Sequence, residues 1–145
     1  MTSRLDRDCF PEFYAIDTRW SDNDIYGHVN NVQYYSFFDS AVNRFLIEHG
    51  GLDIHNDQVV GFVVESKCQY FSPIAYPDTI EIGLSVTKLS NRSVTYQLGV
   101  FVQGQPDICA QGHFVHVFVD QASNQSVAIP DQIRQALNSI VISQI

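Results

Sequence analysis

Residues 32–49 read VQYYSFFDSAVNRFLIEH, and this stretch decides the fold. Its apolar side chains recur at spacings of three and four, which is the period of an α-helix. Asn30 or Asn31 can cap the start of this helix, and the pair Gly50 and Gly51 predicts its end. The apolar stripe is wider than the roughly 100° that a surface helix needs, so we expect an enclosed helix. The stripe comprises Tyr34, Tyr35, Phe37, Phe38, Ala41, Val42, Phe45 and Leu46.

On the carboxyl side of this helix the period changes to two, which is typical of β-strands. One more strand is expected before the helix, at residues 13–20, and a short C-terminal helix at residues 130–140. Four long strands joined by short turns are predicted at residues 59–71, 80–87, 94–102 and 109–120. Because strands and helices do not alternate, a doubly wound parallel sheet is disfavoured. A five-stranded antiparallel sheet wrapped around one helix, the hot-dog architecture of the α+β class, fits the wide stripe, with a generic α+β sandwich as the alternative.

The length and composition narrow the possible partners. The 145 residues suffice for one compact domain, and residues 1–145 are expected to form a single one. Apolar residues make up 45% and charged residues 17%, which argues against intrinsic disorder. A net charge of -8 argues against nucleic acid and anionic membrane surfaces as partners. The longest apolar run, VVGFVV at residues 59–64, is far too short to span a membrane.

The cysteines and histidines predict no metal site. Cys9, Cys68 and Cys109 are odd in number and lack CxxC spacing, so neither a disulfide framework nor a zinc site is expected. Reduced thiols are typical of the cytoplasm, and the charged start of the chain does not resemble a signal peptide, so we expect a cytoplasmic protein. His113 and His116 are three residues apart in a predicted strand and therefore face opposite sides.

The loop before the helix, DNDIYGHVNN at residues 22–31, holds the residues most suited to chemistry. It places carboxylates beside a helix N-terminus, whose unpaired N–H groups carry partial positive charge. Such N–H groups can stabilise an oxyanion, and a nearby carboxylate can attack a carbonyl carbon or deprotonate a water molecule. These are the parts needed to transfer an acyl group to water. From the pattern alone, a purely structural role for Asp22 and Asp24, as capping and turn residues, is the simpler interpretation.

Residues 19–45, RWSDNDIYGHVNNVQYYSFFDSAVNRF, resemble the signature of the 4-hydroxybenzoyl-CoA thioesterase-like acyl-CoA thioesterases, a hot-dog-fold family. Its members carry a D-x-D-x-x-G-H-V-N-N-type loop that runs into a long aromatic helix with a carboxylate and a later Arg, here Asp39 and Arg44. The similarity continues, mainly in pattern, over roughly residues 13–120. It implies hydrolysis of an acyl-CoA to a free acid and coenzyme A. Coenzyme A is then part of the substrate, and no separate cofactor is implied.

The resemblance also implies catalytic roles. Asp24 matches the catalytic carboxylate of the family, which acts as a nucleophile or as a general base. The backbone N–H of Asn31, at the start of the helix, would receive the thioester oxygen. Some relatives have a His where this chain has Asn31. If that His assists catalysis, its role is either missing here or taken by His28. A purely structural role for His28 is equally open.

The resemblance further implies a coenzyme site and an acyl pocket. Coenzyme A is polyanionic, and relatives often carry basic residues and a Ser in the turn that reads LSNRS here, at residues 89–93. Lys88, Arg92 and Ser93 are thus the candidates for binding the phosphates, with a solvated hairpin tip as the alternative. The acyl pocket is expected to be lined by aromatic residues of the helix, namely Tyr34, Tyr35 and Phe38.

A second copy of the chain is expected as a partner. A hot-dog subunit leaves a sheet edge exposed, which a second copy can cover, and the family forms dimers, often paired into tetramers, with each active site built from two chains. Two other functions stay open: a non-catalytic acyl-CoA-binding or sensing module, and an enoyl-CoA hydratase or dehydratase that uses His28. Asp39 and Glu65 are further carboxylates in apolar elements, and Asp39 is expected to be a structural partner of an Arg or a backbone group.

Overall fold

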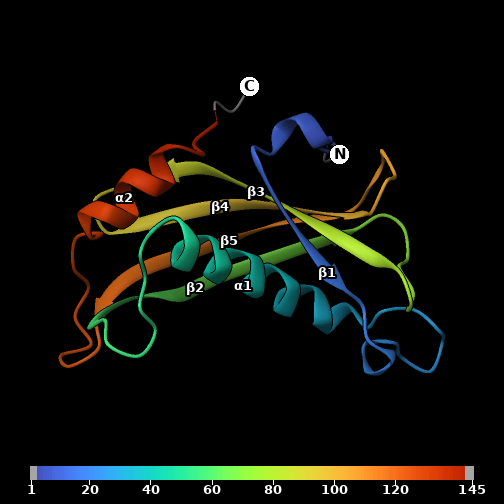
Figure 1. The fold of residues 1–145 in the computed structure, drawn as a ribbon, viewed down its shortest axis with the longest axis horizontal. Coiled ribbons are helices and arrows are strands. Elements are labelled where there is room, and N and C mark those ends of the chain that lie inside the picture. The colour runs from blue at the N-terminus through green and yellow to red at the C-terminus, as the bar shows by residue number, and fades with distance from the viewer. Residues whose placement is uncertain (1–2, 143–145) are drawn as a thin grey trace.

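A five-stranded antiparallel sheet curls around one long helix in this computed structural model, which describes residues 3–142 (Figure 1). The strand order is β1-β3-β4-β5-β2. The predicted hot-dog architecture is thereby confirmed, and the generic sandwich is not adopted. The elements are η1 (Arg7–Cys9), β1 (Glu12–Asp17), η2 (Trp20–Asp22), α1 (Asn31–Glu48), β2 (Val59–Tyr70), β3 (Thr79–Leu89), β4 (Ser93–Val102), β5 (Ile108–Asp120) and α2 (Asp131–Asn138), where η denotes a 3-10 helix.

Helix α1 begins and ends where its sequence predicts. The side chain of Asn30 accepts a hydrogen bond from the N–H of Val32 and so caps the first turn. The helix stops at Glu48, and Gly51 then adopts a φ of 68°, a conformation that glycine adopts readily. Seven residues of the apolar stripe are buried against the sheet: Tyr34, Phe37, Phe38, Ala41, Val42, Phe45 and Leu46.

The first strand is shorter than predicted, because the chain turns before Trp20. Strand β1 ends at Asp17, and Trp20–Asp22 forms a single 3-10 turn. The buried carboxylate of Asp22 accepts hydrogen bonds from the backbone N–H and the guanidinium of Arg19, at 2.8 and 2.9 Å. This local network overrides the aromatic and β-branched pattern that favours a continuous strand.

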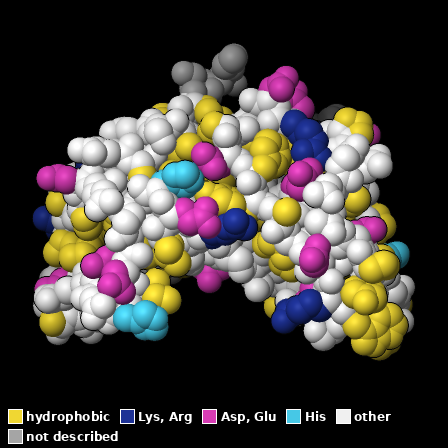
Figure 2. Space-filling model, viewed as in Figure 1, with side chains coloured by type: hydrophobic (Ala, Val, Ile, Leu, Met, Phe, Trp, Pro, Cys, Tyr) yellow, Lys and Arg dark blue, Asp and Glu magenta, His cyan; other side chains and the backbone are white. Residues whose placement is uncertain are grey.

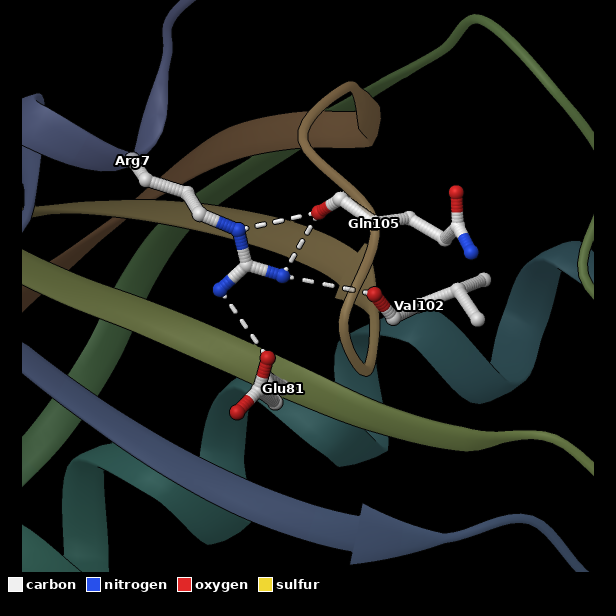
Figure 3. A network of polar contacts seen from close by, with 4 residues as sticks. All are labelled: Arg7, Glu81, Val102 and Gln105. Atoms are coloured by element: carbon white, nitrogen blue, oxygen red, sulfur yellow. Dashed lines mark hydrogen bonds and ion pairs between the residues drawn. The ribbon is translucent and has the colours of Figure 1, made fainter.

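An N-terminal segment, residues 5–10, covers part of the sheet face that is turned away from α1. The ring of Phe10 lies directly over Gly83 and Gly99, where an added Cβ atom would come within 2.6 and 2.7 Å of it. Arg7 fastens the segment by donating to the carbonyl oxygens of Gln105 and Val102 and by pairing with Glu81 at 2.9 Å (Figure 3). No periodic pattern in the sequence predicts this segment.

Strand β2 is an edge strand, and α1 leaves much of it uncovered. Its central residues Phe62, Val63 and Val64 are exposed, whereas most apolar residues of β3 and β4 are buried. The register with β5 shifts between Val63 and Glu65, which marks a bulge. Within residues 3–142 no helix combines the length and apolar character that a membrane span requires.

Candidate active site

The loop before α1 folds into a tight turn with Asp24 at its base. The N–H of Asp24 donates to the carbonyl oxygen of His28 at 2.8 Å, and the N–H of Gly27 donates to that of Asp24 at 3.1 Å. Gly27 has a φ of 84°, which closes the turn. One carboxylate oxygen of Asp24 accepts from the N–H of Tyr26 at 2.8 Å. The other oxygen has no hydrogen-bond partner among residues 3–142, so it is free to react.

The same loop is fastened to the start of the helix and to the chain after β2. The N–H of Val29 donates to the carbonyl oxygen of Ile74 at 2.7 Å, and the N–H of Asn30 donates to that of Asp22 at 2.8 Å. The two loop aspartates therefore differ. Asp22 is buried and paired with Arg19, whereas Asp24 is partly exposed and carries the free oxygen.

The first residue of α1 borders a pocket. The N–H of Val32 donates to the side chain of Asn30, and the N–H of Gln33 donates to the Asn30 carbonyl oxygen. The N–H of Asn31 has no acceptor within the described part of the chain. Asn31 borders a pocket of about 290 Å³ whose other lining residues are His28, Val29, Tyr34, Tyr70, Phe71, Ser72 and Pro73. A helix N-terminus facing a largely apolar pocket is suited to polarise a carbonyl oxygen.

Asp24 borders a second, neighbouring hollow of about 670 Å³, which it shares with Trp20, Ser21, Asn23, Ile25 and Gly27. Within a single chain, Asp24 and Asn31 therefore border two different hollows. The hydrogen bond from the Asp24 N–H to the carbonyl oxygen of His28 connects the residues that line them. Apolar side chains stand out around the second hollow: Trp20 is 76% exposed, Ile25 92% and Tyr26 80%. Hydrophobic side chains gather over this loop in Figure 2, and they leave an open apolar rim beside the candidate catalytic residue.

The three aromatic residues predicted for the acyl pocket lie at different depths. Tyr34 lines the pocket, and burial raises the pKa of its hydroxyl to about 12. Tyr35 is half-buried, with its ring centre 6.4 Å from that of Phe38. Phe38 is completely buried against Phe114 and belongs to the core. Of the three, Tyr34 therefore has direct access to the pocket in a single chain.

Sequence reasoning missed Tyr70, at the end of β2. Its hydroxyl donates to the carbonyl oxygen of Asn31 at 3.1 Å, and its ring lies edge-on to that of Tyr34 with 5.0 Å between the ring centres. Cys68 lies two residues earlier on the same strand, and burial raises the pKa of its thiol to about 11. The alternation within β2 places Cys68 and Tyr70 on one face, but the sequence carries no signal that this face meets the start of α1.

The predicted coenzyme-binding residues gather at the far end of the helix. Arg92 donates to the carbonyl and the hydroxyl of Ser126 at 3.2 and 3.0 Å, and the hydroxyl of Ser93 lies 2.7 Å from that of Ser90. Lys88 is exposed nearby. Their turn lies beside α2, where α1 ends (Figure 1). An 18-residue helix is about 27 Å long, so within one chain these residues do not join Asp24 and Asn31.

The remaining carboxylates and histidines are paired or enclosed elsewhere. Asp39 accepts a hydrogen bond from the side chain of Asn43 at 3.1 Å, so its partner is an Asn rather than the expected Arg or backbone group. Glu65 pairs with His113 at 2.6 Å on the face of the sheet away from α1. His116 points into the core, where burial lowers its pKa to about 4. The prediction that His113 and His116 face opposite sides is confirmed.

Comparisons with known proteins agree with this fold. The family described as the Thioesterase-like superfamily matches residues 18–137. The crystal structure of the PA5185 protein from Pseudomonas aeruginosa strain PAO1 is 55% identical, with a TM-score of 0.94, over 96% of this chain and 97% of that one. The PA2801 protein from Pseudomonas aeruginosa is 29% identical with a TM-score of 0.81, over 88% and 98%. The BH1999 gentisyl-coenzyme A thioesterase is 26% identical with a TM-score of 0.77, over 87% and 99%.

Proposed function

The chain belongs to the thioesterase-like superfamily and is a thioester hydrolase, and we propose that it cleaves acyl-CoA to a free carboxylic acid and coenzyme A through Asp24 and the Asn31 amide. This proposal rests on two groups in the short stretch from Asp24 to Asn31 that have no hydrogen-bond partner among residues 3–142. Within the described part of the chain, the Asn31 N–H lacks an acceptor at the rim of an apolar pocket, and the Asp24 carboxylate keeps one oxygen unbonded.

The proposed chemistry begins at the thioester carbonyl. Its oxygen accepts a hydrogen bond from the N–H of Asn31, and the partial charge of the helix N-terminus stabilises the negative charge that develops there. The free oxygen of Asp24 then either attacks the carbonyl carbon or removes a proton from an attacking water molecule. In the first route the C–S bond breaks to give a mixed anhydride and the thiolate of coenzyme A. Water then hydrolyses the anhydride and restores the carboxylate.

A second copy of the chain would complete this site. Strand β2 presents an unpaired edge with exposed Phe62 and Val64, and the rim formed by Trp20, Ile25 and Tyr26 is apolar and uncovered. Pairing two β2 edges would satisfy the unpaired edge and bury its exposed side chains. A two-fold axis at this edge sets the two α1 helices antiparallel. The turn that holds Arg92 in one copy then approaches the Asn31 pocket of the other. We propose a homodimer, alone or paired into a tetramer, whose coenzyme-binding turn serves the neighbouring site.

The aromatic wall of the pocket guides the choice of acyl group to test first. Tyr34, Tyr70 and Phe71 border it, and aromatic rings pack well against one another at their edges and faces. One relative is a gentisyl-coenzyme A thioesterase. A panel should therefore contain aromatic acyl-CoA thioesters beside short and long fatty ones.

Replacing Asp24 with Asn tests the catalytic role. This change keeps the shape of the side chain but removes its charge and its basicity. We expect kcat to fall by about 10² to 10⁴-fold, as for loss of a catalytic acid or base. The measurement is the release of free thiol from each acyl-CoA of the panel.

Asp39→Asn is the matched control. Asp39 is an exposed carboxylate on α1, and it accepts a hydrogen bond from the side chain of Asn43. Its turnover should equal that of the wild type. Unchanged turnover in Asp24→Asn would remove Asp24 from the mechanism. An acyl-CoA that binds without thiol release would indicate a binding module, and water addition to an enoyl-CoA would indicate a hydratase.

A further inference from the structure

Tyr70, the last residue of β2, ties the sheet to the first turn of α1. Its hydroxyl donates a hydrogen bond to the carbonyl oxygen of Asn31 at 3.1 Å, across 39 positions of sequence. We propose that Tyr70 is a positioning residue, which holds the Asn31 backbone so that its N–H meets the thioester oxygen. This inference rests on the role proposed above for Asn31.

The bond from Tyr70 differs from the other bonds that surround Asn31. The N–H groups of Val32 and Gln33 donate to the side chain and the carbonyl of Asn30 at 3.1 and 2.9 Å. Both bonds belong to the turn itself, so they preserve its shape but do not fix its place relative to the sheet. Among residues 31–34, Tyr70 supplies the hydrogen bond that comes from a distant part of the described chain. Together with the bond from the Val29 N–H to Ile74, it therefore fixes the first turn of α1 against the pocket wall.

The Tyr70 ring is itself held by its neighbours. It meets the ring of Tyr34 edge-on, with an interplanar angle of 87°, and both rings line the pocket that Asn31 borders. Burial, together with the adjacent Cys68 thiol and Tyr35 hydroxyl, raises the pKa of Tyr70 above its usual value. The hydroxyl thus remains a protonated donor throughout the pH range of an enzyme assay.

Removing the Tyr70 hydroxyl should affect catalysis and substrate binding differently. The acyl group packs against the rings, which Tyr70→Phe leaves in place. The carbonyl oxygen gains charge as the transition state forms, and its stabilisation depends on the exact direction of the amide. Loss of the hydroxyl should therefore lower kcat while leaving KM nearly constant.

The kinetic test compares Tyr70→Phe with Tyr76→Phe. The two tyrosines are matched in exposure, at 43% and 42%, and each ring lies edge-on to another aromatic ring, but the Tyr76 hydroxyl has no hydrogen-bond partner among residues 3–142. We expect about a tenfold fall in kcat for Tyr70→Phe, since small misplacements of reacting groups are costly, and wild-type kinetics for Tyr76→Phe. Equal kcat values in the two variants would overturn the inference.

A spectroscopic test excludes a merely structural role. In Asp24→Asn, which should bind acyl-CoA without turnover, the infrared band of a ¹³C-labelled thioester carbonyl should shift to lower frequency when the Asn31 amide polarises it. Adding Tyr70→Phe should move the band back toward its position in free substrate. A variant that only loses stability would melt at a lower temperature with the band unmoved, and that result would overturn the inference. A wild-type enzyme that releases no thiol would instead overturn the proposed function, and this inference with it.

Discussion

His116 shows how a single residue can make the stability of this fold depend on pH. It is 2% exposed, its ring lies 5.1 Å from that of Tyr96, and its Nδ1 has no hydrogen-bond partner within the described chain. Gly61 leaves room for the imidazole, because a Cβ atom there would lie 2.5 Å from Nδ1. Among residues 3–142, His116 has no ion-pair partner, and burial is what disfavours its protonation in the core.

We predict that stability falls as the pH is lowered from about 6.5 to about 4. The folded protein keeps His116 neutral down to its pKa of about 4, whereas the unfolded chain binds a proton below about 6.5. The unfolded state is therefore favoured progressively within this window, by about 3 kcal/mol in total. Urea unfolding of the wild type and of His116→Leu at several pH values measures the effect. Parallel pH dependences for the two proteins would contradict it.

At the scale of elements, the sequence predicts those parts whose pattern is periodic. Helix α1 and strands β2 to β5 follow from periods of 3.6 and two, and the Asn30 cap fixes the start of α1. The N-terminal segment has no period, and long-range contacts order it: Phe10 packs over Gly83 and Gly99, and Arg7 pairs with Glu81. The loop with Asp24 and Asn31 is contiguous, so its motif could be read directly. The bond from Tyr70 depends on how β2 meets α1, which no local pattern encodes.

We predict that Gly83→Ala destabilises the attachment of this segment. The new Cβ atom would lie 2.6 Å from Cγ and 2.9 Å from Cβ of Phe10, so the ring must move away. Overpacking of this kind costs about 1–3 kcal/mol. Urea denaturation measures the loss in the wild type and again in a Phe10→Gly background, which lacks both the Cγ and the Cβ atom that the added methyl group would meet. An equal loss in both backgrounds would show that Phe10 is not the obstacle.

At the scale of the whole molecule, the candidate catalytic loop and the candidate coenzyme-binding turn lie at opposite ends of α1. Several arginines are already engaged within the chain: Arg7 by Glu81, Arg19 by Asp22, and Arg44 by Glu48. The Arg92 guanidinium, in contrast, has no ion-pair partner in the described part of the chain and donates to the carbonyl and the hydroxyl of Ser126, and Lys88 is exposed. Arg92 and Lys88 thus form a small basic region in an acidic protein, and in the proposed dimer a second copy would bring this region to the pocket.

Mixing two inactive variants tests this shared site. Asp24→Asn removes the carboxylate, and Arg92→Glu should weaken coenzyme binding, so each variant alone should be slow at low substrate concentration. If each site draws on two chains, half of the randomly formed dimers are mixed, and each of these holds one intact site. About a quarter of the wild-type activity should then return after the two variants are refolded together. No recovery in mixtures that size-exclusion chromatography shows to be dimeric would place the whole site within one chain.

The enclosed position of Cys68 has a practical consequence. Colorimetric reagents for sulfhydryl groups attack the ionised form, and at pH 8 a group with a pKa of about 11 is only about 0.1% ionised. Cys109 is buried, and Cys9 can be changed to Ser. The enzyme's own cysteine thiols should therefore add little to the colour signal. The release of coenzyme A can then be followed continuously, even at high protein concentration.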